Sequence, residues 1–315
     1  MQRTIGVLVM AYGGPGSLDE VGPYLADIRG GRPTSAELLR EITERYRQIG
    51  GRSPILELTT AQATGIERAL NDDADASDVR YKAYVGMRHW HPYIGDVVQR
   101  MLADGVDEIV AVVMAPHFSR MSIGAYMGKL DKALAEVGRE LPVTKIESWK
   151  AEPPLVDAIV ERIRAALLKF PEDVRADVPI LFTAHSLPSR ILESNDPYPE
   201  ELQTSVRLVV EKLRPHDHRW AFQSQGASAE PWLGPTVEDT LQQLADEGHQ
   251  HVLLVPIGFV CDHVEVLYDV DIEHRRQAEE LGIRLERIEM LNDDPGLVNA
   301  VAAAIRRAIA RSAAA

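Results

Sequence analysis

The sequence predicts an α/β fold with two similar Rossmann-like lobes, each a parallel sheet flanked by helices, and a cleft between the lobes. Apolar runs of strand length alternate with longer helical segments, which is typical of βαβ units and of parallel sheets covered on both faces. The chain also repeats this plan weakly in its two halves. Its 315 residues, 26% charged and 45% hydrophobic, suffice for one large or two ordinary domains.

Two pairs of segments carry the internal repeat. Segments 96–105 and 239–248, which form one of these pairs, each end in Gly, a signal for a helix C-terminus. Each leads into an apolar strand, at 109–114 or 252–257. Alternating apolar strands resemble one another, so a chance match is the competing explanation; duplication is the favoured one. The aligned segments are 5–15 (IGVLVMAYGGP) with 178–188 (VPILFTAHSLP), and 96–105 (DVVQRMLADG) with 239–248 (DTLQQLADEG).

The repeat predicts the domain organisation. We expect an N-terminal lobe over 1–150, a connecting helix within 151–174 and a C-terminal lobe over 175–315. Proline-containing segments 196–199 and 214–217 are predicted to be exposed loops.

A histidine and a glutamate follow predicted strands of the second lobe. His185 lies in the segment 184–188 (AHSLP) after the apolar run 178–182, and Glu265 follows the apolar run 251–257. Ligands of open parallel sheets bind beyond the carboxyl ends of the strands, so both side chains are expected at one rim. An imidazole facing a carboxylate can transfer protons or bind a divalent metal.

Glu265, Asp269 and Glu273 are spaced four residues apart and would line one face of a helix starting near Val264. Such a ladder is usually a solvated face. Two features of the sequence support a functional role: the row of carboxylates begins at the end of a predicted strand, and Glu265 lies in an apolar run. Like charges this close together also repel one another unless cations pass between them. Oxygen and imidazole ligands suit a labile divalent metal.

The remaining histidines give weaker signals. His263 is predicted to point away from Glu265 and to be a hydrogen-bonded structural residue. His117 follows a strand and either faces the cleft or supports its residues, and His89 and His91 are candidates to line the cleft. The other five are expected on polar surfaces: His216, His218, His249, His251 and His274. The repeat also places Tyr12 at the position equivalent to His185, so a phenol and an imidazole would face each other across the cleft.

Composition excludes several classes of protein. A net charge of −14 without a basic tract argues against nucleic-acid binding. A single cysteine, Cys261, excludes an internal disulfide, a four-cysteine iron–sulfur cluster and a cysteine-rich zinc site. The apolar run 5–10 is too short for a signal peptide, and three arginines interrupt 297–315, which is predicted to be a surface helix. The cytoplasm is the expected location.

A set of motifs, in order over nearly the whole chain, resembles the ferrochelatases. The most specific is the last, and the MAYG of the first is similar to the coproporphyrin ferrochelatases of bacteria. The motifs are 9–15 (VMAYGGP), 45–46 (RY), 49–54 (IGGRSP), 115–119 (APHFS), 148–149 (SW), 184–188 (AHSLP), 196–199 (DPYP), 223–224 (QS), 231–235 (PWLGP) and 258–269 (GFVCDHVEVLYD).

The resemblance implies an enzyme that inserts Fe²⁺ into coproporphyrin III in haem biosynthesis. It implies that His185 binds iron or takes a pyrrole proton, and that Tyr12 is an axial ligand of the inserted iron. Glu265, a metal-binding and catalytic residue by the same resemblance, would conduct Fe²⁺ in or protons out together with Asp269 and Glu273. Residues implied at the propionates and the edge of the macrocycle are Arg29, Arg45, Tyr46, Ser53 and Tyr126. Relatives often carry Lys at the position of Arg88.

The expected partners are the porphyrin, Fe²⁺ as a substrate and, transiently, the next enzyme of haem synthesis. We expect a monomer without a resident cofactor, iron–sulfur cluster, nucleic acid or transmembrane segment. Three alternatives stay open: a protoporphyrin IX ferrochelatase, a cobalt chelatase, which usually has a more histidine-rich site, and a non-enzymatic haem carrier.

Overall fold

The chain folds into two compact units. A computed structural model describes residues 3–72, 79–138, 140–213, 216–226, 228 and 230–314. The first unit comprises Met1–Glu152 with Asn292–Ala315, and the second comprises Pro153–Leu291. This division differs from the expected one, because the last segment of the chain returns to the first unit and the predicted connecting helix belongs to the second.

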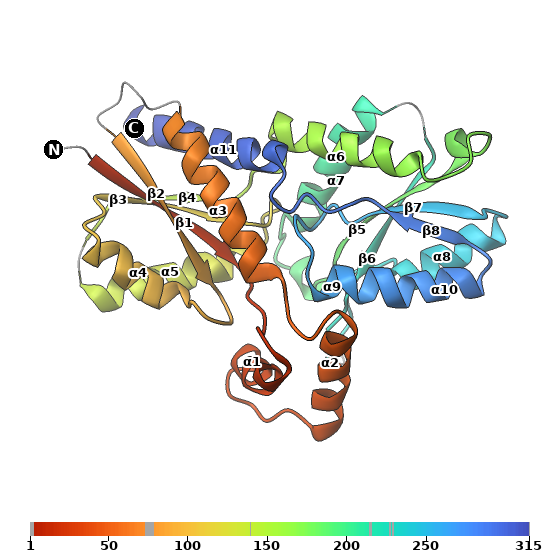
Figure 1. Cartoon of the computed structure of the whole chain (residues 1–315), viewed down its shortest axis with the longest axis horizontal. Helices are drawn as coiled ribbons and strands as arrows, with labels where there is room; N and C mark the ends of the chain where they lie inside the picture. Colours follow the sequence, from red (N-terminus) through yellow and green to blue (C-terminus); the bar gives the residue numbers. More distant parts are fainter. Residues whose placement is uncertain are drawn as a thin grey trace. The chain divides into compact units, whose positions relative to one another are not determined.

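Unit 1 is built on a four-stranded parallel sheet in the order β2-β1-β3-β4. Helices α4 and α5 cover one face, where Leu8 and Met10 of β1 pack against them, and α3 and α11 lie on the other (Figure 1). The elements are β1 (Arg3–Ala11), β2 (Val79–Met87), β3 (Glu108–Val113), β4 (Val143–Ile146), α3 (Ile55–Asp72), α4 (Ile94–Ala103), α5 (Ile123–Val137) and α11 (Pro295–Ala314).

A pair of shorter helices is inserted between β1 and α3. They are α1 (Val21–Ile28), which follows a 3₁₀ turn η1 at Leu18–Glu20, and α2 (Ala36–Gln48). Ser35 caps α2, since its hydroxyl accepts a hydrogen bond from the Leu38 N–H at 3.2 Å. In Figure 1 this pair lies away from the sheet of unit 1.

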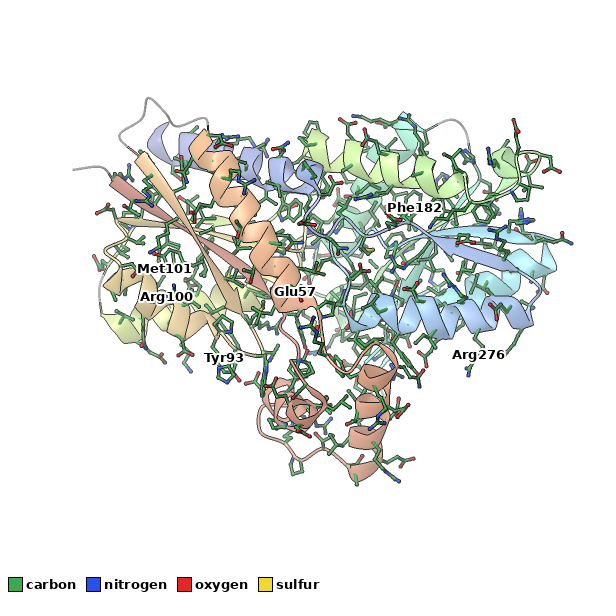
Figure 2. All side chains as sticks on the ribbon, in the orientation of Figure 1. Glu57, Tyr93, Arg100, Met101, Phe182 and Arg276 are labelled. Atoms are coloured by element: carbon green, nitrogen blue, oxygen red, sulfur yellow. The ribbon has the colours of Figure 1, made fainter. Side chains whose placement is uncertain are left out.

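Unit 2 has the same architecture, with a parallel sheet in the order β6-β5-β7-β8. Helices α6 and α7 lie over one face, and α8 and α10 cover the other (Figure 1). Phe182 of β5 is fully buried inside this unit, whereas Arg276 points outward from α10 (Figure 2). The elements are α6 (Pro153–Leu167), η2 (Arg175–Asp177), β5 (Ile180–His185), η3 (Ser189–Ile191), α7 (Tyr198–Lys212), β6 (His218–Gln223), α8 (Val237–Asp246), β7 (His251–Val255), α9 (Val264–Leu267), a π-helix η4 (Asp269–His274), α10 (Arg275–Glu280) and β8 (Arg284–Arg287).

Each unit confirms the predicted parallel sheet flanked by helices, and the two sheets agree with the predicted internal repeat. The first strand of each unit, β1 or β5, lies between the second and third, and α4 and α8 occupy equivalent places before β3 and β7. The aligned segments 5–15 and 178–188 therefore contain the same structural element, the inner strand that ends at the candidate site.

The C-terminal helix was predicted as a surface helix of the second lobe. It is α11 of unit 1, and one side of it is buried against α3, where Val298 lies beside Gly65. Among the described residues no helix is both long and apolar enough to cross a membrane.

Two other local predictions are wrong. Segment 196–199 is not an exposed loop, because Asp196 and Tyr198 are buried and Tyr198 begins α7; the Asp196 carboxylate accepts a hydrogen bond from the Tyr198 N–H at 3.0 Å. His274 is only 3% exposed, since it ends the π-helix on the side that packs into the unit. Residues 214 and 215 of the other predicted loop lie outside the described residues.

Candidate active site

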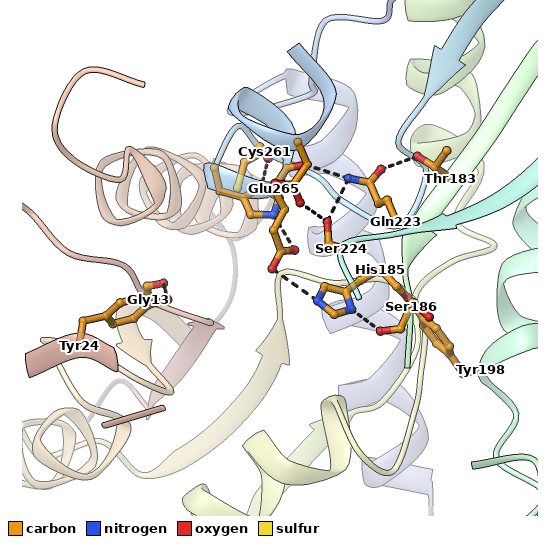
Figure 3. Close-up of polar contacts among 12 residues, drawn as sticks. Gly13, Tyr24, Thr183, His185, Ser186, Tyr198, Gln223, Ser224, Cys261 and Glu265 are labelled. Carbon is orange, nitrogen blue, oxygen red and sulfur yellow. Dashed lines mark hydrogen bonds and ion pairs between the residues drawn. The ribbon is translucent and has the colours of Figure 1, made fainter. Parts of the chain in front are cut away.

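Glu265 lies between two histidines in unit 2. Its Oε1 is 3.5 Å from Nε2 of His185 (Figure 3). Its Oε2 is 3.4 Å from Nε2 of His263. The side chains of His185 and Glu265 are 33% and 31% exposed, so both remain accessible to a ligand. The predicted pairing of His185 with Glu265 is present, whereas the prediction that His263 points elsewhere is wrong, because His263 precedes α9 in extended conformation and its ring turns toward Glu265.

Backbone carbonyls orient both imidazoles. His185 Nδ1 bonds to the Ser186 carbonyl, and His263 Nδ1 bonds to the Cys261 carbonyl at 2.9 Å. A carbonyl oxygen only accepts, so each Nδ1 carries a proton and each Nε2 is the nitrogen presented to the carboxylate. Once Nε2 loses its own proton, it becomes a base or a metal ligand at a fixed place.

The charges of this cluster stabilise one another. Burial by itself lowers the pKa of His185, but the Glu265 carboxylate, the Ser186 carbonyl and the Asp269 charge together raise that pKa to about 9. Burial by itself raises the pKa of Glu265, but His185 and His263 hold it well below its ordinary value. The pKa of His263 is raised as well, against the effect of burial, by Glu265. At neutral pH the resting pair is therefore an imidazolium and a carboxylate.

A hydrogen-bonded row from β5 and β6 supports Glu265 from behind. The Thr183 hydroxyl donates to Gln223 Oε1 at 2.7 Å, and Gln223 Nε2 donates to the Glu265 backbone carbonyl at 2.8 Å (Figure 3). The Ser224 hydroxyl donates to the Asp269 carboxylate. Thr183, Gln223 and Asp269 are buried, so these polar groups need their partners and hold the chain after β7 in one place.

The predicted acidic ridge is only partly an open face. The chain is α-helical over α9 but continues as a π-helix over η4, in which the Glu273 N–H bonds to the Tyr268 carbonyl five residues back. Asp269 is buried and bonded to Ser224, so it is not a solvated rung of a ladder. Glu273 is half-buried one turn further along. Prediction of a regular helix with three equivalent carboxylates was therefore wrong in its geometry.

An arginine clamp, missed at the sequence level, holds the π-helix. Arg287 of β8 donates to both carboxylate oxygens of Asp271, at 2.7 and 2.8 Å, and to Asp262 at 3.1 Å. The clamp joins β8, the segment before α9 and the π-helix, and fork geometry of this kind fixes orientation as well as distance. No local sequence signal marks it, because the partners are 16 and 25 residues away.

Gly258 is required where the chain leaves β7. A β-carbon at this position would lie 2.5 Å from the Ala184 Cβ and 2.8 Å from the Ala184 Cα, which no side chain can tolerate without a backbone shift. The close approach brings the segment that carries His263 and Glu265 against the end of β5, where His185 lies.

Metal binding at this site would use few protein ligands. Within the described part of the chain, no group of three or more His, Cys, Asp and Glu side chains is arranged to hold an ion. His185 and Glu265 offer one nitrogen and one carboxylate, a set that suits an ion in transit more than a caged structural metal.

The second candidate cluster is in unit 1, where β1 ends. Tyr12 is 37% exposed; its ring lies 4.8 Å from the His89 ring, centroid to centroid. The Arg88 guanidinium lies over two phenol rings, 5.8 Å from that of Tyr12 and 5.2 Å from that of Tyr126. Tyr12 directly follows β1 and His185 ends β5, so the predicted equivalence of the two positions holds within the two sheets.

The other residues predicted at the porphyrin lie on the elements around α1 and α2. Arg29 caps the end of α1, and its Nε is buried without a hydrogen-bond partner among the described residues. Arg45 pairs with Glu41 at 2.9 Å, and Tyr46 is buried in α2. Ser53 packs against Gly14, and the Ser53 backbone N–H donates to the Pro15 carbonyl.

His117 is buried in unit 1 and does not reach the surface. It is 3% exposed, and burial together with the Lys150 charge lowers its pKa to about 3. It is therefore neutral at ordinary pH and is better placed to support the end of β3 than to meet a ligand.

A family model and several relatives match nearly the whole chain. The ferrochelatase family model matches residues 4–309. A ferrochelatase of Herpetosiphon aurantiacus is 46% identical over 95% of this chain and 97% of the relative, and one of Deinococcus radiodurans is 43% identical over 99% and 98%. A coproporphyrin III ferrochelatase of Bacillus subtilis is 39% identical over 98% of this chain and 99% of the relative.

Solved structures show the same fold at low sequence identity. SirB from Bacillus subtilis with Fe³⁺ has a TM-score of 0.62 at 10% identity, covering 99% of this chain and 98% of that one. The sirohydrochlorin chelatase SirB from Bacillus subtilis subspecies spizizenii, in complex with cobalt, has a TM-score of 0.55 at 8% identity, covering 97% and 95%. These structures show the fold alone; the family match over residues 4–309 and the ferrochelatases that are 46% and 43% identical place the chain in the ferrochelatase family, the metal chelatases of haem biosynthesis.

Proposed function

We propose that this ferrochelatase acts on coproporphyrin III: Fe²⁺ enters the ring, two pyrrole N–H bonds break, four iron–nitrogen bonds form and two protons leave. The named coproporphyrin III ferrochelatases among its relatives, at 38–40% identity, support the substrate assignment. The relatives of higher identity carry only the broader name.

The observation that carries the proposal is a pair of arginine side chains in unit 1. The Nε atoms of Arg29 and Arg88 are buried and lack hydrogen-bond partners among the described residues. A buried guanidinium N–H without an acceptor is costly, and a substrate carboxylate is an acceptor that guanidinium binds bidentately. Coproporphyrin III has a carboxylate on each of its four pyrrole rings, whereas protoporphyrin IX has carboxylates on only two, so coproporphyrin III offers acceptors at more places to arginines that come from separate segments, the end of α1 and the end of β2.

The proposal assigns proton and metal handling to the cluster of unit 2. His185 is protonated at rest because Glu265 holds its pKa at about 9, so it must release a proton before it can ligate Fe²⁺ or accept a pyrrole proton. Glu265 is ionised and available at once. We therefore assign to Glu265 the first contact with Fe²⁺ and to His185 the following step, with Asp269 and Glu273 along the path of ions and protons.

The phenol of Tyr12 is assigned to the product. Its ring is accessible at the end of β1 and lies beside the Arg88 cation. A tyrosine side chain ligates iron through its phenol oxygen. Iron held in this way would keep coprohaem on the enzyme until a later partner removes it.

Fe²⁺ is a substrate in this scheme, and no resident cofactor is assigned. The one cysteine, Cys261, is buried, and burial raises the pKa of its thiol to about 12. A thiol in that state is a poor metal ligand, because metals bind the thiolate.

A side-by-side measurement of kcat/KM tests the substrate. Coproporphyrin III and protoporphyrin IX are compared with anaerobic Fe²⁺ at one ionic strength and one detergent concentration. Each charge-assisted contact is worth roughly 1.5–3 kcal/mol, so loss of two contacts should lower kcat/KM by about 10²-fold or more. Equal values, or a preference for protoporphyrin IX, would overturn the substrate assignment and leave the ferrochelatase assignment standing.

Arginine variants give the same test a structural control. Arg29→Gln should raise the KM for coproporphyrin III and reduce the preference between the two porphyrins. Arg276→Gln, on the exposed side of α10, is the matched control and should change neither value. Binding without turnover in the wild-type protein would instead indicate a carrier.

A further inference from the structure

A carboxylate, an imidazole and a phenol form a row in unit 1. The Asp27 Oδ2 is 2.8 Å from His89 Nδ1, and the His89 ring lies 4.8 Å from the Tyr12 ring, at 48° between the planes. Asp27 comes from the last turn of α1, and His89 follows β2, 62 residues later. The roles assigned so far use Tyr12 alone and leave the other two residues without a task.

His89 is fixed to Tyr12 by its backbone as well as by its ring. The His89 N–H donates to the Tyr12 carbonyl at 2.9 Å, and the preceding Arg88 N–H donates to the Ala11 carbonyl at the same distance. These bonds extend the pairing of β2 with β1 beyond the strand ends. The side chain of His89 is 11% exposed, so its ring has little freedom to move. It packs beside the phenol ring of Tyr12, which is more exposed.

Asp27 fixes the tautomer and the orientation of the His89 ring. A carboxylate accepts hydrogen bonds, so the ring nitrogen that faces it, Nδ1, carries the proton. The same carboxylate is 3.5 Å from the Tyr93 hydroxyl through its Oδ1, which leaves the two oxygens on different partners. Without Asp27 the imidazole could rotate by half a turn about its χ2 angle or change tautomer, and the surface against Tyr12 would change.

We propose that Asp27 is a positioning residue for the Tyr12 phenol and acts through His89. The proposal rests on the proposed role of Tyr12 as the iron ligand in the product. An outer-shell carboxylate that orients a histidine commonly changes metal affinity or activity by about 10–100-fold when it is removed. We expect the effect of Asp27 mainly on retention of the product, where the direction of the phenol oxygen decides the strength of the bond to iron.

A merely structural role for Asp27 is the competing explanation, since α1 is tied to neighbouring segments in other ways. The Trp90 indole N–H donates to Glu20 at 2.9 Å, and the Tyr24 hydroxyl donates to the Gly13 carbonyl at 3.0 Å. Trp90→Phe removes one such tie and leaves the Asp27–His89 contact in place. It is therefore the matched control for a general loosening of α1.

The test compares Asp27→Ala with Asp27→Asn. The amide oxygen of asparagine can still accept the bond from His89 Nδ1–H, whereas alanine cannot. In the complex with iron coproporphyrin, Asp27→Ala should alter the visible bands that depend on Tyr12 and should weaken retention of the product about 10-fold or more. Asp27→Asn and Trp90→Phe should keep the spectrum and the retention of the wild type.

A second readout needs no porphyrin and no activity. With ¹⁵N-labelled histidine, and His89 assigned by the signal lost in His89→Gln, the His89 Nδ1 should carry the proton in the wild type and in Asp27→Asn. That signal should change in Asp27→Ala. An unchanged His89 signal and product spectrum in Asp27→Ala would overturn the proposal, and so would equal damage in Asp27→Asn.

Tyr12→Phe separates this proposal from the proposed function. If Tyr12→Phe leaves the product spectrum unchanged, the ligand role of Tyr12 fails, and the Asp27 proposal fails with it as a statement about the product. If Tyr12→Phe changes the spectrum but Asp27→Ala does not, only the Asp27 proposal fails.

Discussion

The end of β1 and the end of β5 are equivalent positions with different chemistry. Both strands are the inner first strand of a four-stranded parallel sheet. Tyr12 follows β1 beside His89 and the Arg88 cation, whereas His185 ends β5 beside the Glu265 carboxylate. One scaffold thus carries an aromatic, cationic cluster in unit 1 and an acidic, imidazole-rich cluster in unit 2, which is why fold similarity to other chelatases shows the architecture and not the substrate.

The third strands show how the difference arises. The Met114 N–H bonds to the Met10 carbonyl in unit 1, and the Gly258 N–H bonds to the Thr183 carbonyl in unit 2, so these residues hold matching places after β3 and β7. Only glycine fits in unit 2, because a β-carbon there would meet Ala184. Glycine at this place lets the following segment lie close to the end of β5, where Glu265 reaches His185.

Replacing His185 tests the comparison most severely. His185→Ala should abolish insertion of Fe²⁺ while porphyrin binding and thermal stability stay near those of the wild type, since the imidazole is one-third exposed and little packing is lost. His249→Ala, another half-buried histidine of unit 2, is the control and should be fully active. Turnover near the wild-type rate in His185→Ala would remove the chemical role from the end of β5.

Glu265→Gln should give the next largest effect. It keeps the shape of the side chain and removes its charge, so insertion should slow by about 10²-fold or more, the range for loss of a positioned acid–base group. Glu273→Gln is the internal comparison, because Glu273 has the same chemistry farther along the proposed path, and it should mainly raise the Fe²⁺ concentration needed for half-maximal rate. A larger rate defect in Glu273→Gln than in Glu265→Gln would reverse the assigned order.

The close approach at Gly258 can be tested by its effect on stability. Gly258→Ala should lower the free energy of unfolding by about 1–3 kcal/mol, as overpacking of a tight contact does, and should reduce activity by displacing Glu265. Gly128→Ala in α5 is the control, since a β-carbon there meets nothing within 4 Å and alanine favours a helix. Denaturant unfolding measures both. Equal free energies of unfolding for Gly258→Ala and the wild type would show that the contact with Ala184 does not require glycine at position 258.

Sequence patterns could predict the two sheets and the main pair of the site. Apolar strands, glycine after α4 and α8, and polar residues after β5 and β7 are local signals, and they place His185 and Glu265 at one edge. The return of α11 to unit 1 could not be predicted, because an amphipathic pattern tells which side of a helix is buried but not what covers it.

The geometry around Glu265 was beyond local signals for the same reason. The turn of His263 toward Glu265 depends on the segment after Gly258, and the π-helix is accompanied by the Ser224–Asp269 bond and the Arg287 clamp, which join residues 16 to 45 positions apart. Asp27 and His89 are also far apart in sequence, so their contact appears only once β2 is placed beside β1.

The smallest expected effect concerns pH and the stability of unit 2 without metal. The pKa of His185 is raised to about 9, so the ion pair with Glu265 stabilises the fold fully below the unfolded pKa of about 6.5 and loses that contribution as the pH rises through about 9. The pKa of Glu265 is lowered, so its contribution is present above about 4.5 and is lost as the pH falls. The difference in melting temperature between the wild type and His185→Gln should thus be greatest near pH 6 and smaller at pH 10, and modest throughout because both side chains are about one-third exposed. His249→Gln corrects for general effects of pH on the fold. If the difference in melting temperature between the wild type and His185→Gln is constant from pH 6 to pH 10, His185 is not an imidazolium at rest. The clusters of unit 1 and unit 2 would then differ in composition only.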